Sequence, residues 1–131
     1  RCWFYDLFNP TGAAGEGKPL PEHSPALHGR VLDRFAPWPN VTVTRGKVPD
    51  VLADVAPDRI AFLHIDMNNA AGELAALEAL FERVVSGGVI VLDDYEWSIY
   101  RGQKQAEDPW FEARGYRVVP LPTGQGMLVK R

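Results

Sequence analysis

The sequence has 131 residues, of which 46% are hydrophobic and 24% are charged. This length and composition are typical of one folded domain and exclude a disordered, collagenous or coiled-coil protein as a good fit. The 14 basic and 17 acidic residues give a net charge of −3. We therefore expect neither nucleic acid nor a membrane surface as a partner, because both attract an excess of Lys and Arg. The single cysteine, Cys2, excludes an internal disulfide and a cysteine zinc cluster.

The chain begins at Arg1 without a Met and enters an apolar run at once. This beginning suggests a piece of a longer protein. Its apolar runs are shorter than the ~20 residues of a membrane helix, and no signal-peptide pattern is visible. A cytoplasmic location is therefore expected.

The first half of the chain alternates short apolar runs with stretches rich in glycine and proline. In chain order, we predict a buried strand at 2–5 that ends at Asp6, a loop or lid over 9–29, a helix within 24–36, a strand at 41–45 and a short helix at 48–55. Ser24 can cap the first helix, and Pro25 suits its first turn.

The second half carries the clearest pattern. We predict a strand buried on both faces at 59–65, a helix at 70–85 stopped by Ser86-Gly87-Gly88, a strand at 89–92, a helix over 101–114 and strands at 116–120 and 126–130. Pro109 is expected to start a turn or a new helix rather than to lie inside one. The last two strands are expected to form an antiparallel hairpin.

This alternation of strands and helices predicts an α/β sheet with helices on both faces. Ligands bind such sheets beyond the carboxyl ends of the strands. Acids follow three of the predicted strands, namely Asp6, Asp66 and the pair Asp93-Asp94. Clustered carboxylates repel one another, and a hard divalent cation such as Mg²⁺, which takes oxygen ligands, would relieve that repulsion.

Each of these acids also has a structural explanation. An Asp after a strand is often the N-cap of the next helix, although Asn68 or Asn69 could cap equally well. Asp6 could bind a ribose, but no GxGxxG motif accompanies it. His64 lies inside an apolar strand, which favours a core residue over a ligand.

Other polar and aromatic side chains stay open between packing and function. His23 and His28 lie in or beside the predicted lid, either as surface residues or as a base delivered over a site. The aromatic residues after the acidic pair favour packing, although one of them could line a pocket; they are Trp97, Tyr100 and Trp110. Lys104 is expected on a helix surface.

Residues 62–69 (FLHIDMNN) and 87–95 (GGVIVLDDY) resemble the macrocin O-methyltransferase (TylF-like) family of class I S-adenosylmethionine-dependent methyltransferases. The helix between them carries the Leu-Glu-x-Leu pattern at 77–80, and residues 121–126 (LPTGQG) resemble a branch of that family. Weaker likeness covers residues 4–8 and 44–47. The resemblance implies a Rossmann-like sheet, mostly parallel with a C-terminal antiparallel hairpin. It also implies that 1–131 is the C-terminal portion of a single methyltransferase domain whose N-terminal part is missing.

The resemblance also implies a role for each matching residue. Asp66, Asp93 and Asp94 would bind a Mg²⁺ ion that holds two oxygens of an acceptor sugar. S-adenosylmethionine would lie against Asp6 (at its ribose), Phe8 of the same motif, and Gly46 and Lys47 (near its adenine). The expected partner is a small-molecule or glycan acceptor, and a homo-oligomer is possible.

Two departures from the family pattern matter. Many relatives carry a second acid where this chain has Asn68, which cannot take a proton. The base would then be a histidine (His23, His28 or His64) or water, or activity would be altered. The strand with the Gly-rich cofactor loop would lie before Arg1, so we expect these 131 residues alone to bind S-adenosylmethionine weakly. The alternative function is a non-catalytic Rossmann-like interaction module; a phospho-acceptor receiver domain fits less well, because its acidic pair follows the first strand.

Overall fold

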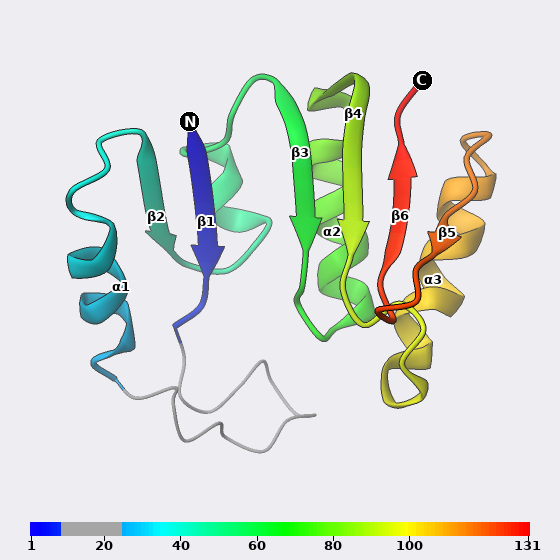
Figure 1. The fold of residues 1–131 in the computed structure, drawn as a ribbon, viewed down its shortest axis with the longest axis horizontal. Helices are drawn as coiled ribbons and strands as arrows, with labels where there is room; N and C mark the ends of the chain where they lie inside the picture. The colour runs from blue at the N-terminus through cyan, green and yellow to red at the C-terminus, as the bar shows by residue number, and fades with distance from the viewer. Residues whose placement is uncertain (9–24) are drawn as a thin grey trace. The chain divides into compact units, whose positions relative to one another are not determined.

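A computed structural model describes residues 1–8 and 25–131. The chain forms two compact units, Arg1–Ala56 (unit 1) and Pro57–Arg131 (unit 2); Figure 1 shows the elements of each. Most of the predicted lid at 9–29 lies outside the described residues, as do His23 and Ser24.

Unit 1 contains two parallel strands. Its elements are β1 (Cys2–Asp6), α1 (Leu27–Phe35), β2 (Val41–Arg45) and the 3-10 helix η1 (Asp50–Ala53). In the register of the pair, Cys2 lies opposite Val41 and Asp6 opposite Arg45. Both strands were predicted, but β1 is not buried: Phe4 is 46% exposed, although its ring stacks on Phe35 at 5.2 Å. Within the described part of this unit β1 pairs only with β2, so little surrounds its side chains.

Unit 2 contains a four-stranded sheet in the order β3-β4-β6-β5. These strands are β3 (Ile60–Ile65), β4 (Val84–Leu92), β5 (Val119–Pro120) and β6 (Gly126–Val129). β3 and β4 are parallel, whereas β6 is antiparallel to both β4 and β5. The α/β class and the C-terminal antiparallel hairpin are therefore confirmed.

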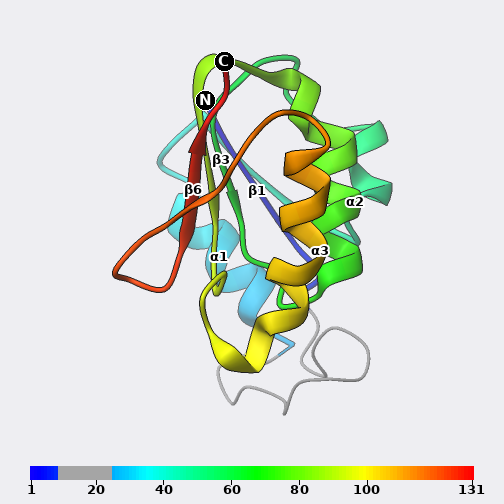
Figure 2. The same ribbon diagram turned by 90° about the vertical axis from the view of Figure 1, so that its right-hand side faces the viewer.

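Two helices cover one face of this sheet. α2 (Ala70–Leu80) and α3 (Arg101–Glu112) pack against each other on the same side, as Figure 2 shows. Two short 3-10 helices, η2 (Phe81–Arg83) and η3 (Ser98–Tyr100), precede β4 and α3. The core between helices and sheet is centred on Leu77, Ile90 and Phe111, each fully buried. Within the described residues, no helix combines the length and the apolar character needed to cross a bilayer.

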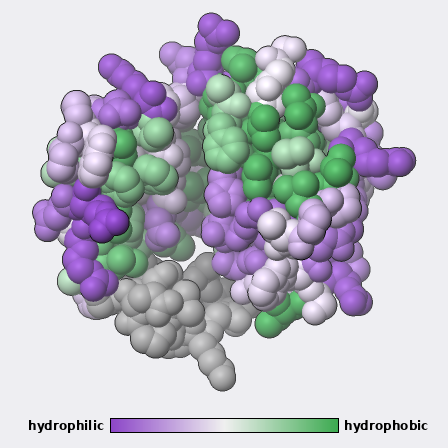
Figure 3. Space-filling view, in the orientation of Figure 1, coloured by the Kyte–Doolittle hydropathy of each residue, from purple (hydrophilic) through white to green (hydrophobic). Residues whose placement is uncertain are grey.

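The opposite face of the same sheet is open. Phe62, Val89 and Val129 occupy one row of the strand register, and Phe62 and Val129 are 63% and 50% exposed. Figure 3 shows hydrophobic residues gathered over this face. Two predictions are therefore wrong for this unit: β3 is not buried on both faces, and helices do not cover both faces. The reason is that β3 is an edge strand here, and both helices lie on the same side.

The predicted helix at 70–85 is too long. α2 ends at Leu80, and Ser86-Gly87-Gly88 lie inside β4 rather than stopping a helix. The register between β3 and β4 shifts between Ile60 and Phe62, and the glycines lie at this irregularity. A Cβ on Gly88 would lie 2.7 Å from the carbonyl oxygen of Val85, so the close backbone approach requires glycine there.

Pro109 also departs from expectation, because it lies inside α3. The helix continues past it, with the Ala113 amide donating to the Pro109 carbonyl at 3.0 Å. Proline removes the donor that the Gln105 carbonyl would normally use. Both residues are exposed, so water can satisfy that carbonyl.

We expect Phe111→Ala to lower the free energy of unfolding of this chain by about 3–5 kcal/mol, because the ring is fully buried. Phe62→Ala removes the same atoms from a site that is 63% exposed; the expected change is within about 0.5 kcal/mol. Urea unfolding of both variants measures the difference. Equal losses would contradict this description of the core.

Candidate functional site

Three carboxylates meet at the carboxyl edge of β3 and β4. Asp66 directly follows β3, and Asp93 and Asp94 directly follow β4. The strands are parallel neighbours, and the Asp93 amide continues their ladder by donating to the Ile65 carbonyl at 2.8 Å. One oxygen from each carboxylate lies within 4.8 Å of the others. The predicted convergence of these acids is therefore present.

Sharp turns in the backbone aim two of the loop residues. Asn68 and Asp94 have φ angles of 52° and 55°, in the left-handed region. This conformation costs most side chains about 1–2 kcal/mol, and Asn and Asp tolerate it best because their short polar side chains can bond locally. The two chain segments therefore turn immediately after they leave the sheet.

Asp66 is not the cap of α2. The N-cap is Asn69, whose side chain accepts a hydrogen bond from the Gly72 amide at 2.8 Å. Asp66 Oδ1 instead accepts from Asn68 Nδ2 at 3.4 Å. The capping explanation for Asp66 is therefore wrong, and Asn68 supports the orientation of this carboxylate.

The electrostatics of the cluster favour a cation. The pKa of Asp94 is raised first by burial and then by the negative charges of Asp93 and Asp66. Carboxylate oxygens are the ligands that hard divalent cations prefer, and oxygens about 2.1 Å from one Mg²⁺ lie at most about 4.2 Å apart. Since all three side chains are at least partly exposed, small rotations would bring their oxygens from within 4.8 Å to that spacing. The set fits a magnesium ion.

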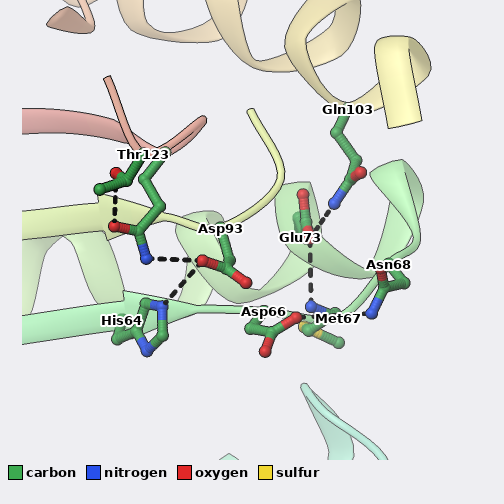
Figure 4. A network of polar contacts seen from close by, with 9 residues as sticks. His64, Asp66, Met67, Asn68, Glu73, Asp93, Gln103 and Thr123 are labelled. Atoms are coloured by element: carbon green, nitrogen blue, oxygen red, sulfur yellow. Dashed lines mark hydrogen bonds and ion pairs between the residues drawn. The ribbon is translucent and has the colours of Figure 1, made fainter. Parts of the chain in front are cut away.

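The C-terminal hairpin orients Asp93. Gln125 Nε2 donates to Asp93 Oδ1 at 2.7 Å, and Thr123 Oγ1 lies 3.0 Å from Gln125 Oε1. Figure 4 shows Asp93 between Thr123 and His64. Gln125 reaches the site because Gly126 pairs with Leu92 across β6 and β4. The sequence analysis did not identify it as a site residue, although it lies within the LPTGQG stretch.

His64 lies beside the acids rather than in the core. Its side chain is 42% exposed, and its Nε2 is 3.8 Å from Asp93 Oδ1. The interpretation of His64 as a core residue is therefore wrong. His28 lies in unit 1, where its ring packs on Phe8 at 4.6 Å.

An acid that the sequence pattern placed away from the core is buried behind the Asp66 loop. Glu73 is 1% exposed, and its Oε1 accepts from the Met67 amide at 3.1 Å and from Gln103 Nε2. Glu107 of α3 is fully buried beside it. The amphipathic pattern of α2 could not reveal this, because it contains no information about the polar partners that α3 supplies.

An open cavity of about 340 Å³ begins one residue after Asp94. It is lined by Tyr95, Glu96, Trp97, Ser98, Arg101 and Lys104. Trp97 is 56% exposed, which fits the pocket-lining alternative, and Lys104 pairs with Glu96. Trp110, in contrast, packs on Phe81 at 5.2 Å, as expected for a packing residue.

The four residues expected to bind the cofactor lie in unit 1. Asp6 ends β1 and Gly46 follows β2, and the Gly46 amide donates to the Asp6 carbonyl at 3.0 Å. The Phe8 amide donates to Asp6 Oδ1, while its ring is buried. A Cβ on Gly46 would lie 2.1 Å from Val51 Cγ1, which requires glycine. Lys47 is exposed beside it. The structure therefore gathers all four at the carboxyl edge of β1 and β2.

Charge repulsion in the cluster predicts a stabilising substitution. Because the pKa of Asp94 is raised in the folded chain, its ionisation disfavours folding as the pH rises through that value. Asp94→Asn should therefore stabilise the metal-free chain at about pH 7. It should have no effect at about pH 2, below both pKa values. Urea unfolding in EDTA measures both. A variant that is equally or less stable at neutral pH would contradict mutual repulsion.

Comparison with known proteins places this site in a family. Residues 13–95 match the family model described as a methyltransferase domain. No curated protein matches the chain. The structure is similar to that of the O-methyltransferase NovP, with 21% identity, a TM-score of 0.74, and coverage of 98% of this chain and 59% of that one. It is also similar to CalS11, a TDP-rhamnose 3'-O-methyltransferase of calicheamicin biosynthesis, with 21% identity and a TM-score of 0.68 over 97% of this chain and 57% of that one.

At these identities the structural likeness establishes the fold, which is the Rossmann-like methyltransferase fold. The chain spans somewhat more than half the length of either neighbour. The family match is independent of these neighbours and covers well over half of the chain. The chain therefore belongs to the methyltransferase-domain family.

Proposed function

We propose that the protein carrying this chain is an S-adenosylmethionine- and Mg²⁺-dependent O-methyltransferase of the macrocin (TylF-like) type that acts on a sugar hydroxyl. The convergence of Asp66, Asp93 and Asp94 in a methyltransferase-family chain carries the proposal. The choice of a sugar is supported by the resemblance and by the similar fold of CalS11, which is named for its sugar substrate. The chain would then be the C-terminal portion of one methyltransferase domain.

The residues of the two units would divide the work. Asp66, Asp93 and Asp94 would hold Mg²⁺, which lowers the pKa of a bound hydroxyl and fixes its oxygen. Asp6, Phe8, Gly46 and Lys47 would contact S-adenosylmethionine, the source of the methyl group. Gln125 would keep Asp93 aimed at the site through its 2.7 Å hydrogen bond.

A base is needed for the proton of the acceptor hydroxyl, and Asn68 cannot supply it. Among the described histidines, His64 is favoured because it is half exposed and its Nε2 lies 3.8 Å from Asp93 Oδ1. That neighbouring carboxylate would also stabilise the imidazolium formed when Nε2 takes the proton. The exposed Trp97 and the cationic Arg101, both beside Asp94 in the open cavity, are suited to contact the acceptor.

Asp93→Asn and Asp94→Ala in the full-length protein should each lower divalent-dependent methyl transfer more than about 100-fold. Losing a ligand should cost more than losing an outer partner, which costs about 10–100-fold. Transfer of radiolabelled methyl groups to glycoside acceptors, with and without Mg²⁺, measures the effect. Asp58→Asn, at an exposed acid of the same unit, is the control and should retain full activity.

Wild-type activity in both cluster variants would sink the metal assignment. Calorimetry showing that the full-length protein binds neither S-adenosylmethionine nor a divalent cation would support the second candidate, a non-catalytic Rossmann-like interaction module. The observation that favours this second candidate is Asn68, where many relatives carry an acid.

A further inference from the structure

Three polar side chains are buried between α2 and α3, directly behind the Asp66 loop. Glu73, Gln103 and Glu107 are 1%, 3% and 0% exposed. Among the described residues, no hydrogen-bond partner reaches Glu73 Oε2, Gln103 Oε1 or either carboxyl oxygen of Glu107. Burying such groups is costly, and two acids placed together are costlier still. Helix packing alone does not require them, because Leu77 and Phe111 already fill the core beside them.

The contacts of Glu73 lead to the candidate metal centre. Its Oε1 accepts from the backbone amide of Met67 at 3.1 Å and from Gln103 Nε2. Figure 4 shows Glu73 between Gln103 on α3 and Met67 in the loop. Met67 directly follows Asp66, so this bond fixes the peptide that carries the Asp66 carboxylate.

The second acid has a proton to share at neutral pH. Burial raises the pKa of Glu107 to about 9, and the negative charge of Glu73 adds to the effect. A neutral Glu107 can donate its proton, and Glu73 Oε2 is an acceptor that otherwise lacks a partner. The pair would then hold one negative charge, with Glu73 as the carboxylate that grips the loop.

We propose that Glu73, held by Gln103 and Glu107, is a positioning residue that fixes Asp66 for cation binding. The proposal rests on the proposed function, since it assigns Glu73 to the same metal site. Asp66 and Asn68 are exposed, and Asn68 is in a left-handed conformation, so the loop has little packing of its own to hold it. Without the bond to Met67, Asp66 would lose its fixed place near Asp93 and Asp94.

The test measures Mn²⁺ binding by the full-length protein, using electron paramagnetic resonance without substrate or cofactor. Glu73→Ala should weaken Mn²⁺ binding about 10–100-fold, the usual effect of losing an outer partner. Glu73→Gln should restore most of the affinity, because its amide oxygen can still accept from Met67. Glu78→Ala is the matched control: Glu78 lies on the same helix and bonds Trp110 and Arg114 of the α3 segment, far from the loop in sequence. It should leave Mn²⁺ affinity unchanged.

Thermal unfolding of each variant separates a positioning role from a structural one. If Glu73→Ala and Glu78→Ala destabilise the protein and both leave Mn²⁺ affinity at the wild-type value, the positioning role is overturned while the metal site stands. If wild-type protein itself does not bind Mn²⁺, the proposed function fails and the inference fails with it. Should Glu73→Ala not fold, Gln103→Ala decides: it removes one of the two donors to Glu73 and should weaken Mn²⁺ binding several-fold, and unchanged affinity overturns the proposal.

Discussion

The repulsion among three carboxylates at one edge of a parallel strand pair is the constraint that organises unit 2. Asp66, Asp93 and Asp94 are brought together by the pairing of β3 with β4. Their mutual charge and partial burial raise the pKa of Asp94. Such a cluster is unfavourable to folding when it is empty and favourable when a divalent cation neutralises it. The left-handed turns at Asn68 and Asp94 add local strain to the same place, as is common in sites built for a ligand.

Support for the acids arrives from two directions. The β5–β6 hairpin supplies Gln125, a neutral donor that favours the charged form of Asp93. The α2–α3 interface supplies Glu73, which holds the loop through the Met67 amide. These two elements contact the site independently, one at each strand end. The carboxylates are thus oriented before any ion arrives, which is the condition for tight and selective binding.

Periodicity and strand-end chemistry predicted much of this arrangement, because both are local properties of the sequence. The apolar run before Asp66 and the one before Asp93-Asp94 were enough to predict two parallel strands with their acids together. Boundaries failed where tertiary pairing overrides a local signal: the glycines at 87–88 suggested a helix end but belong to β4. Glu73 was missed because a helical pattern shows which residues could face the solvent, but not which polar partner another helix brings.

Crystals of the full-length protein soaked in Mn²⁺ would test the central claim most directly, through anomalous diffraction. The account predicts one anomalous peak, bonded to an oxygen from each of Asp66, Asp93 and Asp94. Carboxylates that point apart, or a saturating soak that leaves no peak among them, would contradict it. The fold would stand in that case, and the role of the three acids would not.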